Sequence, residues 1–223
     1  MTSAASWRAR LASSMSDGPA PPAGRRIGVL VSGRGSNLQA LIDAVRDGRL
    51  QATIAVVLCN VPDAPALVKA TNAGIETLVA SHLGWPSREA YDEHLAEALH
   101  ARQVDVVCLA GFMRRLSARF LERFSGPVLN VHPSLLPAFP GVDAPDQALT
   151  HGVRVAGCTV HLVTAELDAG PIVRQACVAV HPDDSPASLS ARILVEEHRL
   201  LPEAVARVLA GGWRVDGRRF VDA

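Results

Sequence analysis

The sequence predicts an α/β protein built on a doubly wound, mostly parallel sheet with an antiparallel C-terminal portion. From residue 27 to residue 131, short apolar runs alternate with amphipathic helical segments, which is typical of a parallel sheet covered by helices. Beyond residue 137, two longer apolar runs follow each other with only a turn between them. Hydrophobic residues make up 48% of the 223 residues, enough for a sizeable core.

The first part of the alternation begins with an unbroken apolar run, residues 27–31, which we expect to be a buried strand. An amphipathic helix over residues 38–46 follows. Residues 53–59 predict a second apolar strand, and residues 63–73 predict a helix. Residues 75–79 complete this part as a short strand.

Serine residues mark the starts of the next two helices. Ser87 precedes a long helical segment that ends near Ala101, and Ser117 precedes a short one. A serine hydroxyl in this position accepts a hydrogen bond from a free N–H group of the first helical turn. Apolar strands at residues 104–109 and 128–131 continue the alternation.

The pattern changes after Pro137. Residues 139–151 predict a loop with one helical turn. Residues 155–164 and 172–180 predict two longer strands, and the short turn between them allows an antiparallel pair.

The last long helix is expected to start at Ser185. Pro202 falls inside this helix, and proline lacks an N–H group and clashes with the preceding turn, so we expect a kink or a division there. Residues 213–221 hold two short strand-like runs around Asp216-Gly217, which is a hairpin turn signal.

Residues 1–24 are rich in Ala, Ser, Pro and Gly, and this composition predicts a disordered N-terminal extension. A transit peptide is the alternative, because serine and arginine are present and acidic residues are scarce. We expect one domain over residues 25–223.

Charge and cysteine content limit the classes of function. The formal net charge is zero, which argues against non-specific binding to nucleic acid or to an anionic membrane. No apolar run is long enough to span a bilayer. The four cysteines lie singly in apolar runs without zinc-ligand spacing, so we expect reduced thiols in a cytoplasmic protein.

Polar side chains end the strand that begins at Val128. Asn130 and His132 stand at its carboxyl end, and Asp168 lies in a later turn just before Gly170. Open α/β sheets bind ligands at the carboxyl ends of their strands. An amide, an imidazole and a carboxylate that meet there indicate a catalytic group.

Each of these three residues also has a purely structural interpretation. Asn130 could satisfy backbone groups at the strand end, His132 could be a packed histidine, and Asp168 could close an Asx-turn. A metal site with His132, His161 and Asp168 as ligands is a further alternative.

A glycine-rich turn, GRGSN at residues 33–37, joins the first strand to the first helix. Such a turn lets backbone N–H groups approach a phosphate, and the helix dipole favours the anion. A dinucleotide fits less well, because Leu38 stands where a third glycine is needed and no acidic residue ends the next strand. On the pattern alone, an N-cap formed by Ser36 or Asn37 is an equally good interpretation.

Six short motifs are distributed over the chain: GRGSN at residues 33–37, AGFMR at 110–114, NVHPSLLP at 130–137, FPG at 139–141, LDAGP at 167–171 and EH at 197–198. Taken together, they resemble the folate-dependent formyltransferases, which have a Rossmann-like formyltransferase fold. The resemblance extends from about residue 27 to residue 215. The SLLP element alone is shared by several kinds of enzyme in this family, whereas the conjunction is much more specific.

The resemblance implies transfer of the formyl group of 10-formyltetrahydrofolate to the amine of glycinamide ribonucleotide, in de novo purine biosynthesis. It implies catalysis by Asn130, His132 and Asp168 without a metal ion. The N-terminal half is then expected to bind the ribonucleotide, and the C-terminal half to bind folate and carry catalysis. Five residues match ribonucleotide-binding positions: Gly33, Gly35, Ser36, Asn37 and Glu197.

The resemblance also places eight residues at the folate: Arg88, Phe112, Met113, Arg114, Arg115, Leu116, Asn130 and Val163. Their apolar members could line a flat slot for the pterin, and the guanidinium groups could meet its glutamate carboxylates. An equally good interpretation of Arg88 is a solvated partner of Asp92, one helical turn on. The sequence departs from relatives at Arg115, where an aliphatic residue is common, and at Asp143 and Pro145, near which several carry histidines.

Three other functions fit parts of the pattern. A 10-formyltetrahydrofolate hydrolase would keep the catalytic group but usually carries an N-terminal regulatory domain, for which residues 1–26 are too short. A methionyl-tRNA formyltransferase would need a further C-terminal domain and a basic surface. A nucleotide-sensing binding protein of similar fold is the non-enzymatic alternative. We therefore expect small-molecule substrates, no nucleic-acid or membrane partner, and a monomer or homodimer.

Overall fold

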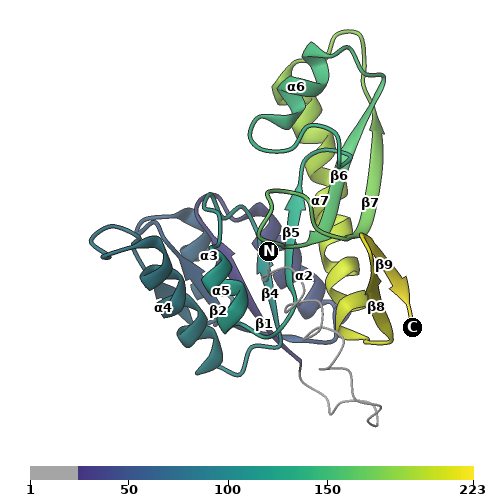
Figure 1. Ribbon diagram of the computed structural model, residues 1–223. Coiled ribbons are helices and arrows are strands. Elements are labelled where there is room, and N and C mark those ends of the chain that lie inside the picture. The colour runs from purple at the N-terminus through teal and green to yellow at the C-terminus, as the bar shows by residue number, and fades with distance from the viewer. Residues whose placement is uncertain (1–24) are drawn as a thin grey trace.

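The computed structural model describes residues 25–223, and the predicted disordered extension, residues 1–24, lies outside the described residues. A nine-stranded sheet runs through the described part of the chain in the order β3-β2-β1-β4-β5-β6-β7-β9-β8 (Figure 1). Its strands are β1 (Arg26–Val31), β2 (Thr53–Cys59), β3 (Thr77–Val79), β4 (Val106–Leu109), β5 (Val128–His132), β6 (Val155–Leu162), β7 (Ile172–Ala179), β8 (Trp213–Asp216) and β9 (Arg219–Asp222).

The helices alternate with the first strands, as the sequence predicts. They are α2 (Ser36–Arg46), α3 (Pro65–Asn72), α4 (Arg88–His100), α5 (Ala118–Arg123), α6 (Ala144–Thr150) and α7 (Pro186–Leu209). None of the helices within residues 25–223 combines the length and the apolar character that crossing a membrane requires.

The first five strands pair in parallel, and the strand order reverses at β1, which lies between β2 and β4. Such a reversal opens a crevice outside the carboxyl ends of the strands. The segments that follow β1 and β4 meet there: the Ser32 N–H donates to the Gly111 carbonyl, and the Ser32 hydroxyl accepts from the Met113 N–H. The sheet therefore places the glycine turn beside the AGFMR motif.

The later strands pair antiparallel, β5 with β6 and β6 with β7, so the predicted fold class is confirmed. The register between β5 and β6 sets Asn130 opposite His161 and His132 opposite Thr159. Because cross-strand neighbours lie on the same face of a sheet, this register decides which side chains meet at the strand ends. Figure 1 shows the far ends of β6 and β7 extending with α6 away from the parallel part.

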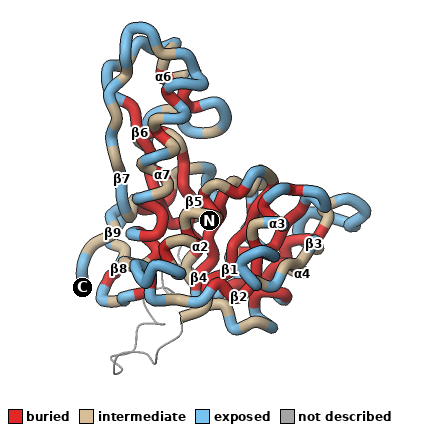
Figure 2. Tube along the Cα trace, turned by 180° about the vertical axis from the view of Figure 1, so that it is seen from behind, coloured by how far each residue is buried: buried red, intermediate tan, exposed pale blue. Residues whose placement is uncertain are grey.

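Two apolar layers cover the sheet. The layer under α2, α3 and α7 includes Leu38, Leu41 and Leu200, and the layer under α4 and α5 includes Tyr91 and Phe120. Figure 2 shows the buried segments concentrated along the central strands and the inner sides of the helices. Each fully buried side chain of this size contributes about 1.5–3 kcal/mol relative to exposure, so these layers fix the helices that carry the site.

The helix starts at the predicted serines are confirmed. The hydroxyls of Ser87, Ser117 and Ser185 each accept a hydrogen bond from an N–H group three residues later. These bonds satisfy N–H groups that a helix leaves free in its first turn.

The expected division of the last helix at Pro202 is wrong. α7 runs without interruption through 24 residues, and Pro202 is buried inside it. The flanking residues Leu200, Leu201, Ala204 and Val205 are also buried against the sheet. Their burial outweighs the hydrogen bond that proline cannot form, so tertiary packing overrides the local preference. The one-turn helix expected within residues 139–151 is longer than predicted, because α6 has seven residues.

Candidate active site

The glycine turn connects β1 to α2 through Gly35, which occupies the N-cap position with a left-handed backbone at φ 68° and has no side chain to cap the helix. Within residues 25–223, no side chain caps the free N–H groups at the start of α2. Ser36 and Asn37 lie inside the helix, so the N-cap that the sequence allowed them is not formed. The uncapped helix start presents backbone donors to an anion.

The two glycines of this turn have different packing. A Cβ on Gly35 would lie 2.7 Å from the Cβ and 2.9 Å from the Cα of Ala66 on α3. A Cβ on Gly33 would meet no atom within 4 Å. Gly35 therefore allows α2 and α3 to approach each other, whereas the open side of Gly33 faces unoccupied space.

We expect Gly35→Ala to reduce the free energy of unfolding by at least about 1–2 kcal/mol, the cost of a left-handed backbone in a residue with a Cβ. The contact with Ala66 adds to that cost, because Ala66 Cα is backbone. Gly33→Ala is the matched control, with stability close to wild type. Urea unfolding of both variants checks this, and equal destabilisation would contradict the packing described for Gly35.

Asn37 and Glu197 connect α2 to α7 across 160 residues of sequence. Asn37 Nδ2 donates a hydrogen bond of 2.7 Å to Glu197 Oε2, and both residues are buried. Asn37 Oδ1 is also buried, and within residues 25–223 it has no hydrogen-bond partner. Burial raises the pKa of Glu197, and the bond from Asn37 offsets part of that rise. Two of the predicted ribonucleotide-binding residues therefore meet, and each has oxygen acceptors.

Glu197→Gln is expected to stabilise the protein in a pH-dependent way. The pKa of Glu197 is raised in the folded protein, so wild-type stability falls as the pH rises through that folded-state value. Glutamine does not ionise and still accepts from Asn37. We expect a higher Tm than wild type near pH 7 and a difference that shrinks toward about pH 4, near the reference value of a glutamate. Thermal unfolding at both pH values checks this, with exposed Glu203→Gln as control, and a pH-independent difference would contradict it.

The register of β5 and β6 brings Asn130 and His161 into contact. His161 Nδ1 lies 3.0 Å from the Leu162 carbonyl, which only accepts, so Nδ1 carries the hydrogen. His161 Nε2 is then an acceptor, and Asn130 Nδ2 donates to it at 3.2 Å. Burial lowers the pKa of His161, which favours this neutral ring. The amide of Asn130 is thus oriented, and its second N–H remains available.

Asp168 lies between two imidazoles. Its Oδ2 is 3.5 Å from His132 Nδ1, and its Oδ1 is 3.7 Å from His161 Nε2. Oδ2 accepts a hydrogen bond of 2.8 Å from the Gly141 N–H, a contact outside its own turn, in contrast to the Asx-turn alternative. The backbone of Asp168 is left-handed, at φ 49°, which aspartate tolerates better than most residues.

His132 is buried at the end of β5 and is held from the other side. Its Nε2 lies 2.9 Å from the Phe139 carbonyl, so Nε2 carries a hydrogen and Nδ1 faces Asp168. The loop that carries Phe139 is tied to β6, because the Leu136 N–H donates to Thr159 Oγ1 at 3.0 Å. Catalytic hydrogen bonds commonly tighten when reactants bind, so the 3.5 Å separation from Asp168 is compatible with proton transfer.

His161 is the residue of this group that the predicted catalytic set leaves out. The sequence offers it only as a metal ligand. In the structure its two nitrogens contact Leu162 and Asn130, so its lone pair already accepts a hydrogen bond. Its place in the group depends on the β5–β6 register, which no local motif specifies.

The predicted folate residues lie on the AGFMR segment and near it. Phe112 and Val163 pack against the apolar cluster that contains Leu116, whereas Met113 is 77% exposed. Because Phe112, Leu116 and Val163 share one apolar surface, they are consistent with the wall of a slot. The folate contacts themselves stay a prediction.

Of the three arginines predicted at the folate, only Arg88 forms an ion pair within residues 25–223, and that ion pair is long. The Arg114 guanidinium lies 5.3 Å from the centre of the Tyr91 ring, and Arg115 Nη2 is 3.4 Å from the Ala165 carbonyl. Arg88 pairs with Glu89 at 3.5 Å. The alternative pairing of Arg88 with Asp92 is not formed, because Asp92 is buried and accepts from the Ser117 N–H at 2.6 Å.

The fold and the site together define an α/β protein whose first sheet-covering helix starts with free backbone donors, and which holds a group of amide, imidazole and carboxylate side chains at the end of β5. Residues 25–205 match the family described as formyl transferase. The chain therefore belongs to the formyl transferase family, and the resemblance inferred from its motifs is confirmed.

Individual relatives agree with this family. A phosphoribosylglycinamide formyltransferase of Escherichia coli (strain K12) is 45% identical over 192 residues, which cover 85% of this chain and 87% of that protein. A trifunctional purine biosynthetic protein adenosine-3 of Drosophila melanogaster is 48% identical, but this chain spans only 14% of its length. The solved structure of glycinamide ribonucleotide transformylase 1 from Symbiobacterium toebii has a TM-score of 0.89 at 48% identity, over 93% of this chain and 99% of that chain.

Proposed function

We propose that this chain transfers the formyl group of 10-formyltetrahydrofolate to the amine of glycinamide ribonucleotide, a step of de novo purine biosynthesis. The observation that carries the proposal is the group of Asn130, His161, Asp168 and His132 at the carboxyl ends of the strands. The names of full-length relatives support the same reaction. We place the reaction in the cytoplasm, and the oligomeric state, monomer or homodimer, stays a prediction.

The ribonucleotide is proposed to bind along α2, in the N-terminal half of a domain over residues 25–223, with Glu197 contributed by α7 of the C-terminal half. The uncapped start of α2, with Gly33, Gly35 and Ser36, receives the 5′-phosphate through backbone donors. The carboxylate of Glu197 would repel a phosphate, so it accepts instead from a hydroxyl of the ribose.

Folate is proposed to bind between the AGFMR segment and the C-terminal half, which holds the catalytic group. Phe112, Leu116 and Val163 form the apolar wall for the pterin. The glutamate carboxylates of folate are proposed to bind Arg88 and Arg114. In the structure, Arg88 has only a long ion pair with Glu89, and Arg114 lies over the Tyr91 ring.

Catalysis follows from what these residues donate and accept. The amine attacks the formyl carbon, and negative charge develops on the formyl oxygen as the new C–N bond forms. Asn130 donates its free N–H to that oxygen, and His132 stabilises the same charge when its ring is protonated. The amine loses a proton, and the departing folate nitrogen gains one as its bond to carbon breaks. Asp168, beside both imidazoles, holds this proton in transit.

Hydrolysis of the same donor uses water in place of the amine, and an experiment separates the two reactions. The protein is incubated with 10-formyltetrahydrofolate, with and without glycinamide ribonucleotide, and the release of tetrahydrofolate is followed. Transfer predicts release that depends on the ribonucleotide, with ribose 5-phosphate, which lacks the amine, as control. Release at the same rate in all three conditions would favour the hydrolase and overturn the proposal.

A further inference from the structure

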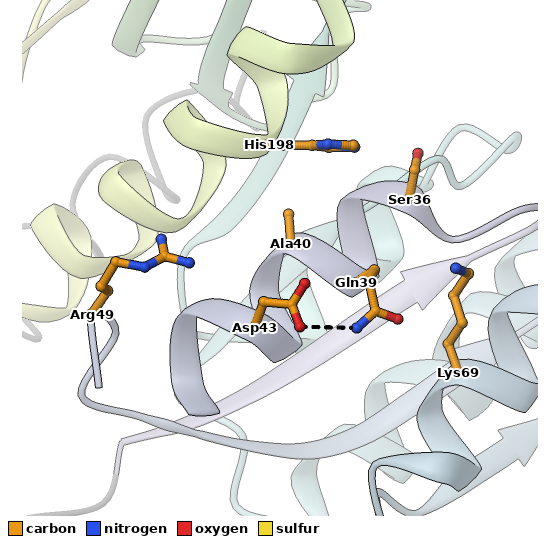
Figure 3. Close-up of a pocket in the computed structure, with 7 residues that line it drawn as sticks. All are labelled: Ser36, Gln39, Ala40, Asp43, Arg49, Lys69 and His198. Atoms are coloured by element: carbon orange, nitrogen blue, oxygen red, sulfur yellow. Dashed lines mark hydrogen bonds between the residues drawn. The ribbon is translucent and has the colours of Figure 1, made fainter. Parts of the chain in front are cut away.

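A cavity of about 340 Å³ lies beside the glycine turn, between α2, α3 and α7 (Figure 3). We call it the α2 cavity. It is within the size range of small-molecule sites. The polar residues that line it are Ser36, Gln39, Asp43, Arg49, Lys69 and His198. Ser36 and His198 are the sequence neighbours of Asn37 and Glu197, so the cavity adjoins the proposed ribonucleotide site.

The positive charges of this cavity stand at its two ends. Lys69 is at the Ser36 end, because its Cδ lies 3.5 Å from the position of a Cβ on Gly35. Arg49 follows the far end of α2, as Figure 3 shows. Arg49 has an acidic neighbour at 3.5 Å, Asp47. Lys69 forms no ion pair with any residue from 25 to 223, so its charge is available to a ligand.

The acidic residue of the cavity is already engaged. Asp43 forms an ion pair with Arg46 at 3.0 Å and accepts a hydrogen bond from Gln39 at 3.1 Å. His198 adds a polar atom without a partner, because its Nε2 is buried and forms no hydrogen bond within the described part of the chain. Figure 3 shows the ring of His198 above the same face of α2 as Ser36. A buried polar atom without a partner is costly, and a ligand oxygen that bonds to it removes that cost.

We propose that Lys69 supplies the counter-charge for a phosphate monoester bound at the Ser36 end of the α2 cavity. Four kinds of donor converge on that end: the Lys69 ammonium, the Ser36 hydroxyl, the uncapped N–H groups of α2 and the ring of His198. The inference rests on the proposed function, in which the ligand is the 5′-phosphate of the ribonucleotide. It extends the predicted set of ribonucleotide-binding residues to Lys69 and His198.

Binding of inorganic phosphate to the full chain, measured by isothermal titration calorimetry, tests the assignment without any turnover. Lys69→Met is expected to raise the Kd for phosphate about tenfold, the effect of losing one charge-assisted hydrogen bond. Lys69→Arg keeps the charge and should bind phosphate nearly as wild type does. Arg49→Met removes one positive charge from the other end of the same cavity and should leave the Kd almost unchanged. Circular dichroism verifies that each variant is folded.

Kinetics then connects the phosphate to the substrate. Inorganic phosphate should compete with the ribonucleotide, and Lys69→Met should raise the KM for the ribonucleotide about tenfold with little change in kcat or in the KM for folate. An unchanged phosphate Kd in Lys69→Met, or equal losses in Lys69→Met and Arg49→Met, would overturn the inference. Inhibition by phosphate that does not compete with the ribonucleotide would overturn its assignment to the substrate.

The same data separate this inference from the proposed function. If the chain transfers no formyl group but its phosphate affinity depends on Lys69, the anion site stands and the proposed function fails. If transfer proceeds normally and phosphate binding ignores Lys69, the function stands and the inference fails.

Discussion

Asp168→Asn is expected to lower kcat about a hundred- to a thousandfold, the loss that follows removal of one preorganised group beside a developing oxyanion. The carboxylate lies 3.5 Å from His132 Nδ1 and 3.7 Å from His161 Nε2, so the substitution removes a negative charge from between the two imidazoles. Asparagine keeps the shape, still accepts from Gly141 and tolerates the left-handed backbone at φ 49°. Steady-state kinetics at saturating substrates measures the change.

Asp143→Asn is the matched control for this substitution. Asp143 also has a left-handed backbone, at φ 54°, but its side chain is exposed and caps no helix. The kcat of the Asp143→Asn variant should stay within about twofold of wild type, as for most surface substitutions. In Asp168→Asn, the KM for the ribonucleotide should change far less than kcat, because the ribonucleotide phosphate is proposed to bind at the start of α2. A near-normal kcat in folded Asp168→Asn would remove this carboxylate from the mechanism.

Asn130→Leu should produce a loss of similar size in kcat, about a hundred- to a thousandfold, because it removes the proposed oxyanion donor. Leucine has the same number of side-chain heavy atoms and the same branching as asparagine, but it cannot donate to the formyl oxygen or to His161 Nε2. Asn72→Leu, the same change at an exposed position at the end of α3, is the control and should keep normal kinetics. Equal kcat values for folded Asn130→Leu and the control would show that the amide plays no part in catalysis.

Local sequence signals predicted most of the fold. Apolar runs marked the buried strands, and the serines before α4, α5 and α7 marked helix starts that the structure confirms. The predicted division of the last helix at Pro202 is wrong, because the local effect of proline is opposed by the burial of α7 against the sheet. That burial is a tertiary property, and no pattern within the helix reports it.

The candidate site was predictable where it follows strand ends. Asn130 and His132 could be selected because polar residues at the end of a buried parallel strand lie at the ligand edge of such a sheet. Asp168 follows an antiparallel strand, and the LDAGP motif singled it out. His161 could not be selected, because its contact with Asn130 depends on the antiparallel register. Lys69 could not either, because its place beside the glycine turn depends on the close packing of α2 against α3.

The formyl carbon itself provides the most direct measurement. The donor is prepared with a carbon-13 formyl group, incubated with the protein and glycinamide ribonucleotide, and followed by NMR. We predict that the label appears in the formylated amide of the ribonucleotide, that it does so only when the ribonucleotide is present, and that little free formate forms. Label that accumulates as formate at the same rate with and without the ribonucleotide would contradict direct transfer to the amine.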